Sequence, residues 1–267
     1  MEKLEGAPES LAEIVAQLHW KTQAQRPGLP GGMVLLQPGD EVLCVQFGTQ
    51  ISQLGFTQVQ RLVPPGVPFI NPQQPLYKYT SPSAPSLVYQ MGVDLLSVHL
   101  VKPFKAWGEL VGEVQRGVDM LQSALALGGN TIAFESLTLR YIHGFGDVNS
   151  ATLDWLTRIL GITVSFPSAL SSAMSTDTSP DFSFNLKTIL TANDATTLTL
   201  AIRKGDLEGA PRIIMDSALI LSHSIAGDAV SDSLNTLHGQ WCNVFQGMTR
   251  TSLTADCQEG DKHVAGH

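Results

Sequence analysis

The chain has 267 residues, of which 43% are apolar and 15% charged, proportions that are ordinary for a globular protein with one large domain or two small ones. Its formal net charge of −8 disfavours nucleic-acid binding, because phosphate backbones need concentrated Lys and Arg side chains. Cys44, Cys242 and Cys257 form no CxxC or histidine-spaced pattern, so zinc is disfavoured and a reducing compartment is favoured. No cofactor is predicted.

The N-terminal residues carry no targeting signal that we recognise. MEKLEGAPES is acidic and lacks the apolar core of a signal peptide. No apolar run reaches the roughly 18 residues that a membrane span requires. The sequence therefore predicts a cytoplasmic protein without a membrane partner.

Residues 11–20 alternate, with Ile14, Ala16, Leu18 and Trp20 on one side, which predicts a half-buried strand. After turn-forming residues, 42–47 predicts a short strand. Seven prolines follow between positions 64 and 85. They favour an extended connection, with an edge strand over 76–79.

The best-defined unit runs from 87 to 145 and predicts strand, strand, helix and strand. Its helix carries an apolar stripe at spacings of three and four: Trp107, Val111, Val114, Val118, Leu121 and Leu125. Pro103 suits a first-turn position. Gly128 and Gly129 suit the end of the helix.

The second half repeats this inventory. It predicts a short helix over 151–160, an exposed loop over 168–180, and strands over 181–192, 196–203 and 210–222. A final helix over 228–248 has a second apolar stripe, with Asp228 as its N-cap. Residues 251–267 predict a disordered tail.

We therefore predict a single α+β domain over 1–250, with antiparallel sheets and two long covering amphipathic helices. Its halves, about 10–149 and 150–250, contain similar elements without an evident sequence repeat. A pseudo-duplicated arrangement is left open at this point.

Five stretches, in order from Ser10 to Thr251, resemble a sporadically distributed bacterial protein family of unassigned function. They are SLAEIVAQLHW, LGFTQVQRLVPPGVP, YQMGVDLLSVHLVKPFKAWGEL, LTLRYIHGFGDV and LNTLHGQWCNVF. The resemblance implies an architecture and little chemistry. Patchy distribution of such families often accompanies defence-associated or mobile genes. The chain departs from the family pattern at His143, where we expect Asp or Asn.

Two charged residues lie within otherwise apolar predicted strands, Arg140 in LTLRYIHGF and Asp216 in RIIMDSALIL. One interpretation makes them an anion anchor and a general base in one pocket, with His99 as a further member. The other makes them a structural ion pair, or two residues on a solvated sheet face. We favour the structural interpretation.

The remaining patterns do not indicate catalysis. His19, His99, His143 and His238 have neither helical i,i+4 spacing nor neighbouring carboxylates in a ligand pattern. No GxSxG, GxGxxG or P-loop pattern is present. We therefore predict no metal site and no catalytic residue.

The favoured function is that of a non-catalytic binding or accessory protein, which recognises a partner protein through a sheet face or the proline-rich segment. The predicted binding residues are Arg61, Tyr77, Arg140, His143 and Asp216. The alternative is an enzyme acting on a small anionic ligand at Arg140 and Asp216. Homo-oligomerisation is left open.

Overall fold

The computed structural model describes residues 10–20, 33–67, 69–71, 73–104, 106–126, 132–146, 153–165, 167–168, 183–191 and 196–248. The predicted tail over 251–267, and nearly all of the predicted loop over 168–180, lie outside these residues.

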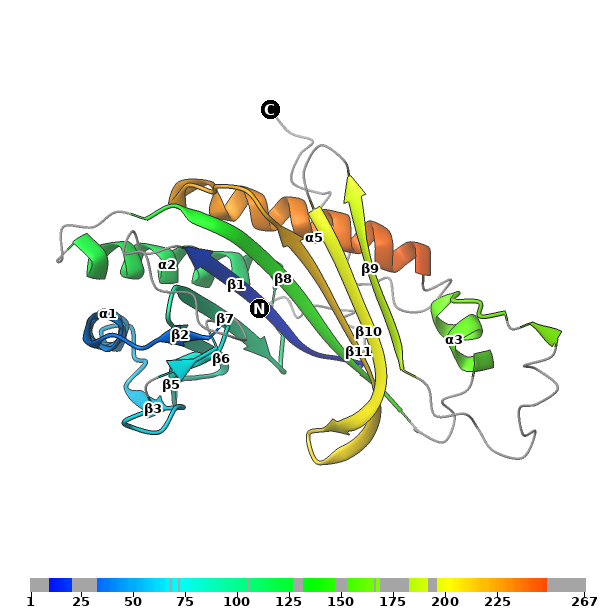
Figure 1. Ribbon diagram of the computed structural model, residues 1–267, viewed down its shortest axis with the longest axis horizontal. Coiled ribbons are helices and arrows are strands. Elements are labelled where there is room, and N and C mark those ends of the chain that lie inside the picture. Colours follow the sequence, from blue (N-terminus) through cyan, green and yellow to red (C-terminus); the bar gives the residue numbers. More distant parts are fainter. Residues whose placement is uncertain are drawn as a thin grey trace.

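The structure is built on one antiparallel sheet of nine strands, which crosses the whole molecule (Figure 1). Its strands are β1 (Leu11–Trp20), β3 (Gln58–Arg61), β5 (Pro75–Ser81), β6 (Ala84–Gly92), β7 (Leu95–Val101), β8 (Phe134–Phe145), β9 (Phe184–Thr191), β10 (Thr196–Leu207) and β11 (Ala210–Leu221). Their order in the sheet is β3-β5-β6-β7-β1-β8-β11-β10-β9. The predicted α+β class with an antiparallel sheet is confirmed.

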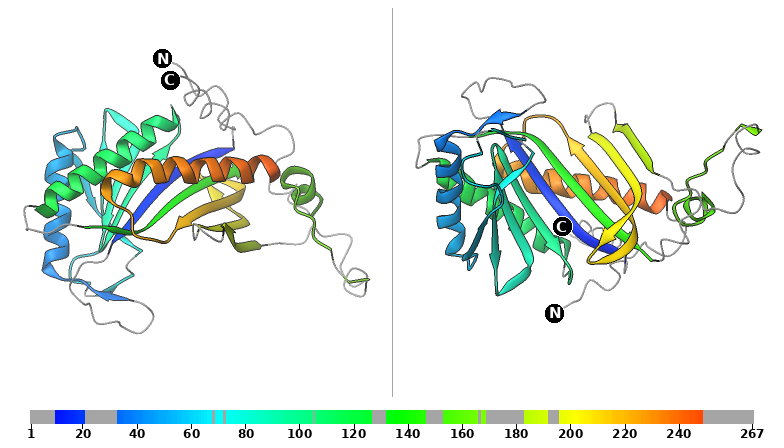
Figure 2. Two further views of the ribbon diagram at one scale, coloured as in Figure 1. Left: turned by 90° about the horizontal axis from the view of Figure 1, so that it is seen from above. Right: turned by 60° about the horizontal axis from the view of Figure 1, so that its bottom comes forward.

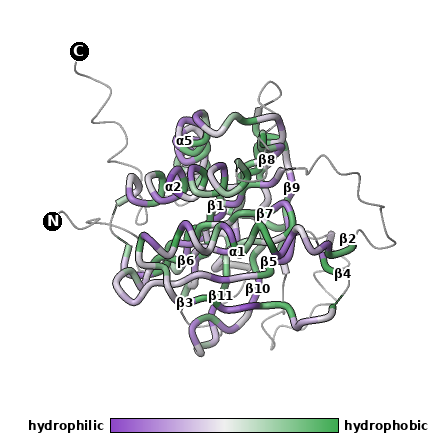
Figure 3. The backbone as a smooth tube through the Cα atoms, turned by 90° about the vertical axis from the view of Figure 1, so that its left-hand side faces the viewer, coloured by the Kyte–Doolittle hydropathy of each residue, from purple (hydrophilic) through white to green (hydrophobic). Residues whose placement is uncertain are grey.

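The described helices pack against this sheet, two of them side by side above the strands in the view along the molecule (Figure 3). They are α1 (Pro38–Ser52), α2 (Trp107–Ala126), α3 (Leu153–Leu160), a 3₁₀ turn (Gly227–Ala229) and α5 (Val230–Met248). A small second sheet pairs β2 (Val34–Leu35) with β4 (Phe69–Ile70). None of the described helices is both long and apolar enough to cross a membrane.

Strand β8 shows how the sequence divides the sheet into two faces. Leu137, Leu139 and Tyr141 are buried beneath α2 and α5, while Thr138 and Arg140 alternate with them. We call the side of Leu139 the helix face and the side of Arg140 the open face. No described helix lies over the open face (Figure 2).

The predicted short strand over 42–47 is wrong, because these residues belong to α1. Pro38 occupies the first turn, and the backbone N–H of Gln37 donates to the carboxylate of Asp40 at 2.8 Å. Such a reciprocal cap satisfies N–H groups that have no partner within the helix. Cys44, Phe47 and Ile51 form the buried stripe of α1.

The proline-rich segment contains more strand than predicted. Residues 76–79 do form a strand, but β3 pairs outside it, so β5 is not at the sheet edge. Two helix starts also differ from prediction. Helix α2 begins at Trp107, beyond Pro103, and Asp228 lies in the 3₁₀ turn before α5 instead of capping it.

Replacing Leu121 by Ala should lower the free energy of unfolding by about 2–4 kcal/mol, because the side chain is fully buried in α2 and its loss leaves a cavity. Ser123→Ala, on the exposed side of the same helix, should change it by less than about 0.5 kcal/mol. Urea denaturation measures both, and equal midpoints would contradict this placement of the helix face. Glu113, which the stripe places on the solvent side, cannot serve as the control because its carboxylate accepts a hydrogen bond from the Tyr89 hydroxyl at 2.8 Å.

Candidate functional site

The five predicted binding residues do not form one site. Arg140 and Asp216 share the open face, and they form a bidentate ion pair. His143 lies on the other face of Arg140's own strand and is fully buried. Arg61 and Tyr77 face each other across β3 and β5, near the far end of the sheet.

The strand register builds a continuous row of side chains across the centre of the open face. Val15 of β1 pairs with His99 of β7 on one side and with Arg140 of β8 on the other. Arg140 in turn pairs with Ala218 of β11. Val15 is only 1% exposed between its two polar neighbours, so the row is closely packed at its centre.

Hydrogen bonds connect the two polar residues of this row, His99 and Arg140, with polar residues in the neighbouring rows of the sheet. The imidazole of His99 contacts the Glu13 carboxylate at 2.7 Å through Nδ1 and the Ser97 hydroxyl at 3.0 Å through Nε2. Arg140 Nε donates to Asp216 Oδ1 at 2.6 Å, and its Nη2 donates to Oδ2. We call these five residues the central polar cluster.

A hydrogen-bonded series of serine, histidine and carboxylate can activate a serine nucleophile. Here Ser97 is 1% exposed, between strands on both sides. An acyl group therefore cannot reach its hydroxyl without a local opening of the sheet. The geometry supports a structural hydrogen bond better than nucleophilic catalysis.

The cluster also does not offer a free cation for a small anion. The hydrogen bonds to Asp216 raise the pKa of Arg140, and the charge of Glu13 raises it further although burial opposes them. The guanidinium is thus permanently charged, and nearby carboxylates already balance it. This weakens the interpretation of Arg140 as an anion anchor.

The ion pair should be energetically coupled, but more weakly than a fully buried pair. Its side chains are 38% and 23% exposed, so Arg140→Met or Asp216→Leu alone should cost about 2 kcal/mol. The double variant should cost at least about 1 kcal/mol less than the sum of the singles. Denaturant unfolding of the three variants tests this, and additive effects would show that the two side chains are uncoupled.

His143 belongs to an aromatic cluster beneath α5. Its ring stacks on Phe245 and Trp241, with centroids 5.1 and 5.7 Å apart. Its Nδ1 lies 3.3 Å from the Ser10 hydroxyl, and Nε2 has no hydrogen-bond partner. Burial, with a smaller effect of Lys102, lowers the pKa of His143 to about 3. His143 is a buried core residue, so its ring has no exposed surface with which to contact a partner.

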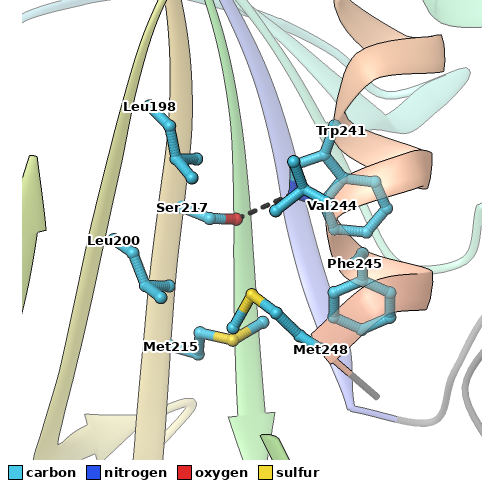
Figure 4. A pocket seen from close by; sticks show the side chains of 8 residues that line it. All are labelled: Leu198, Leu200, Met215, Ser217, Trp241, Val244, Phe245 and Met248. Atoms are coloured by element: carbon cyan, nitrogen blue, oxygen red, sulfur yellow. Dashed lines mark hydrogen bonds between the residues drawn. The ribbon is translucent and has the colours of Figure 1, made fainter. Parts of the chain in front are cut away.

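Beside this cluster is a small apolar hollow, part of which is open to solvent (Figure 4). It is lined by Leu198, Leu200, Met215, Ser217, Trp241, Val244, Phe245 and Met248. The one hydroxyl in this lining already accepts from Trp241 Nε1 at 3.0 Å and donates to the Tyr141 carbonyl at 3.4 Å. The hollow therefore has no free polar group to orient a ligand.

Arg61 and Tyr77 have structural contacts of their own. Arg61 forms an ion pair with Glu41 of α1, and thereby ties the edge strand β3 to that helix. Tyr77 stacks on Tyr79, with ring centroids 6.5 Å apart, and is partly buried. Tyr79 donates its hydroxyl to the Cys44 carbonyl at 2.7 Å. This region is a packed end of the sheet.

The open face carries more basic than acidic side chains, although the chain as a whole is acidic. The register places basic residues from several strands on the side of Arg140: Lys78, Arg140, Lys187, Arg203 and Arg212. Glu13 and Asp216 are acidic residues on that face. Among the described residues, basic groups remain in excess even if Glu135, in the irregular start of β8, and Glu208, in the turn between β10 and β11, are added. The chain carries a net charge of −8.

Sequence reasoning did not identify four of these basic residues. The period of two was a usable signal for Arg203, which shares the parity of Thr197 and Thr199 in β10. It was no signal for Arg212, whose parity in β11 is shared by Ile214, Ala218 and Ile220. What the sequence could not provide was the order and register of the strands, which bring these positions onto one surface.

The described residues include no group of three or more His, Cys, Asp or Glu side chains that could hold a metal ion. Comparisons of the chain with protein-family models, curated proteins and solved structures find no match. The resemblance to the sporadically distributed bacterial family therefore stays a prediction.

Proposed function

We propose that the protein is a non-catalytic binding protein, which recognises an acidic partner protein through the open face of its sheet. The observation that carries this proposal is the excess of basic side chains on that face in a chain of net charge −8. Complementary charge speeds encounter and selects partners. The face is also broad, since it extends over strands from both halves of the chain (Figure 2).

The central polar cluster supports this function by holding the middle of the face in one shape. Its histidine contacts join β7 to β1, and its ion pair joins β8 to β11, on the two sides of the centre of the sheet. A surface that is rigid before binding loses less conformational entropy when a partner docks. The cluster therefore acts as a support, and the outer basic side chains make the contacts.

Site-specific photo-crosslinking tests the proposal. A photoreactive residue replaces Thr138 or Gln17 on the open face, or Gln122 on the exposed side of α2 as the control. In lysate of the source cells, we expect the open-face positions to capture one defined protein of acidic composition. Equal capture at the control position, or no capture at the open face, would contradict the proposal.

A second candidate is an enzyme acting on a small anionic ligand near Arg140 and Asp216, and the series Ser97–His99–Glu13 is the observation in its favour. A fluorophosphonate probe labels activated serines. We expect no labelling, because Ser97 is buried. Labelling that disappears in Ser97→Ala would favour the enzyme.

We propose further that the two halves are pseudo-duplicated, with α2 and α5 as equivalent covering helices and with the division between α2 and β8 instead of the predicted one at about 149/150. Each half contains a strand, a helix, three neighbouring antiparallel strands and a long helix, with β3 as an extra edge strand in the first. The sheet order supports this, because β1 and β8 meet at the centre, and each is next to the last strand of its own half. The pseudo-two-fold axis would pass close to the central polar cluster.

The setting we propose is the bacterial cytoplasm, in a defence-associated or mobile genetic system. It rests on the sequence resemblance alone, because Cys242 is disulfide-bonded and does not support the predicted reducing compartment. Homo-oligomerisation also remains a proposal. The same crosslinking experiment bears on it, since a captured second copy would identify self-association.

A further inference from the structure

The hairpin between β10 and β11 extends beyond the rest of the sheet. Pairing of β10 with β9 ends at Ile202, and pairing of β11 with β8 ends at Ile213. Within the described part of the chain, the two strands pair only with each other from Arg203 to Arg212. We call these residues the hook, because they project from the end of the sheet and curl (Figure 1).

The end of the hook is a tight turn. Glu208 and Gly209 both have positive φ, 57° and 76°, as the two-residue turns that fit the twist of a hairpin require. The N–H of Gly209 donates to the Asp206 carboxylate at 3.0 Å. The turn is thus shorter than the predicted connection over 204–209, and both strands continue almost to its end.

The hook bends over the open face. Leu207 lies so close to Gly144 of β8 that a Cβ added to Gly144 would clash with Cδ2 of Leu207. Gly144 is on the open face, next to Ile214 in the register. Ile214 is 5% exposed, and Leu207 is half-buried. The contact between Leu207 and Gly144 therefore fixes the curvature of the hook.

Two exposed arginines lie on the same side of the hook as the open face. Arg203 pairs with Ile214, and Arg212 pairs with Gly205, so both arginines point to the same face as Ile214. Both are exposed. The guanidinium of Arg203 lies over Gly205, where a Cβ would be 2.8 Å from Nη1. Neither arginine forms an ion pair or hydrogen bond to another described residue. The hook contains two acidic residues: Asp206 has the opposite parity, and Glu208 lies in the turn.

We propose that Arg203 and Arg212 form a carboxylate clamp, in which the hook binds an acidic, extended segment of the partner protein. This rests on the proposed function and gives the partner's contact a place and a chemistry. Free guanidinium groups bind carboxylates in a bidentate manner. Two of them at the rim of one surface suit a segment with several carboxylates. The short hairpin presents them without a large loss of backbone entropy.

Fluorescence anisotropy with a fluorescein-labelled oligoglutamate peptide tests the clamp, using the full chain. We expect the peptide to bind, oligoglutamine not to bind, and Arg203→Gln or Arg212→Gln to weaken binding about tenfold each. Lys204→Gln is the matched control, because it removes the same charge from the opposite side of the hook. Its affinity should stay within about twofold of the parent. Denaturation midpoints confirm that all variants remain folded.

Equal weakening in the Lys204→Gln control would overturn the clamp in favour of a general charge effect, and unchanged binding in both arginine variants would also overturn it. Tighter, arginine-dependent binding of a single-stranded oligonucleotide would assign the hook to nucleic acid instead. Sedimentation that shows arginine-dependent self-association without peptide binding would assign it to a second copy. If open-face crosslinks persist in the double arginine variant, the proposed function stands and the clamp is wrong.

Discussion

Lowering the pH from about 7.5 to about 5 should reduce the free energy of unfolding by about 4 kcal/mol through two buried histidines. Burial lowers the pKa of His143 to about 3 and that of His238 to about 4, from the ordinary value of 6.5. Each histidine should account for about 2 kcal/mol of this loss at pH 5. Urea denaturation over this range measures the effect.

The direction follows from where the proton binds. As the pH falls through 6.5, the unfolded chain protonates both imidazoles, whereas the folded protein keeps them neutral until about pH 4 and 3. Stability is therefore fully present above about pH 6.5 and declines steadily below it. In the fold, a protonated His143 would place an N–H at Nε2, which has no acceptor. The ring of His238 is stacked on Trp107, with centroids 4.0 Å apart.

Two variants separate this effect from the titration of carboxylates. His143→Phe keeps an aromatic ring against Phe245, and His238→Gln keeps an acceptor for the Tyr141 hydroxyl, which lies 2.6 Å from Nδ1. Neither new side chain titrates in this range. Each variant should lose about half of the histidine-dependent decline, whatever its stability at pH 7.5. An unchanged pH dependence in both variants would contradict the assignment.

The sequence predicted best those elements whose hydrophobic pattern is regular over many residues. Strands β8 and β10 alternate over many residues, β11 is an apolar run that follows turn-forming residues, and α2 and α5 have stripes at spacings of three and four. Each element was therefore placed from its own residues. Helix α1 was missed for a physical reason. Val42 and Val45 are exposed at 55% and 59%, and as β-branched residues between the buried ones they imitated a strand.

The candidate site was less accessible from sequence, because its residues become neighbours only through the sheet order. Isolated charges in apolar strands did single out Arg140 and Asp216. The pairing of β8 with β11 was needed to show that they contact each other. The Glu13 contact of His99 joins residues 86 positions apart, and the bend of the hook depends on Leu207 reaching Gly144. Neither pattern has a local signature in the chain.

Replacing Trp241 by Ala should lower the free energy of unfolding by about 3–5 kcal/mol. The indole is 2% exposed and stacks on Tyr141 and Phe245, with centroids 3.8 and 4.6 Å apart. Its removal leaves a large cavity next to the apolar hollow. It also deprives the buried Ser217 hydroxyl of its donor. Both losses weaken the contact between α5 and the sheet, so the expected effect exceeds that of a Leu→Ala change at the same depth.

Trp107→Ala is the matched control, because it is the same substitution at a half-buried position. Trp107 stacks on His238 and donates from Nε1 to Asn235 at the surface, so its loss should cost about 1–2 kcal/mol. Trp241→Phe should fall between the two, since it restores most of the apolar volume but not the hydrogen bond to Ser217. Denaturant midpoints of the three variants give this order. If Trp107→Ala were the more destabilising change, α5 would not be the helix that closes the core.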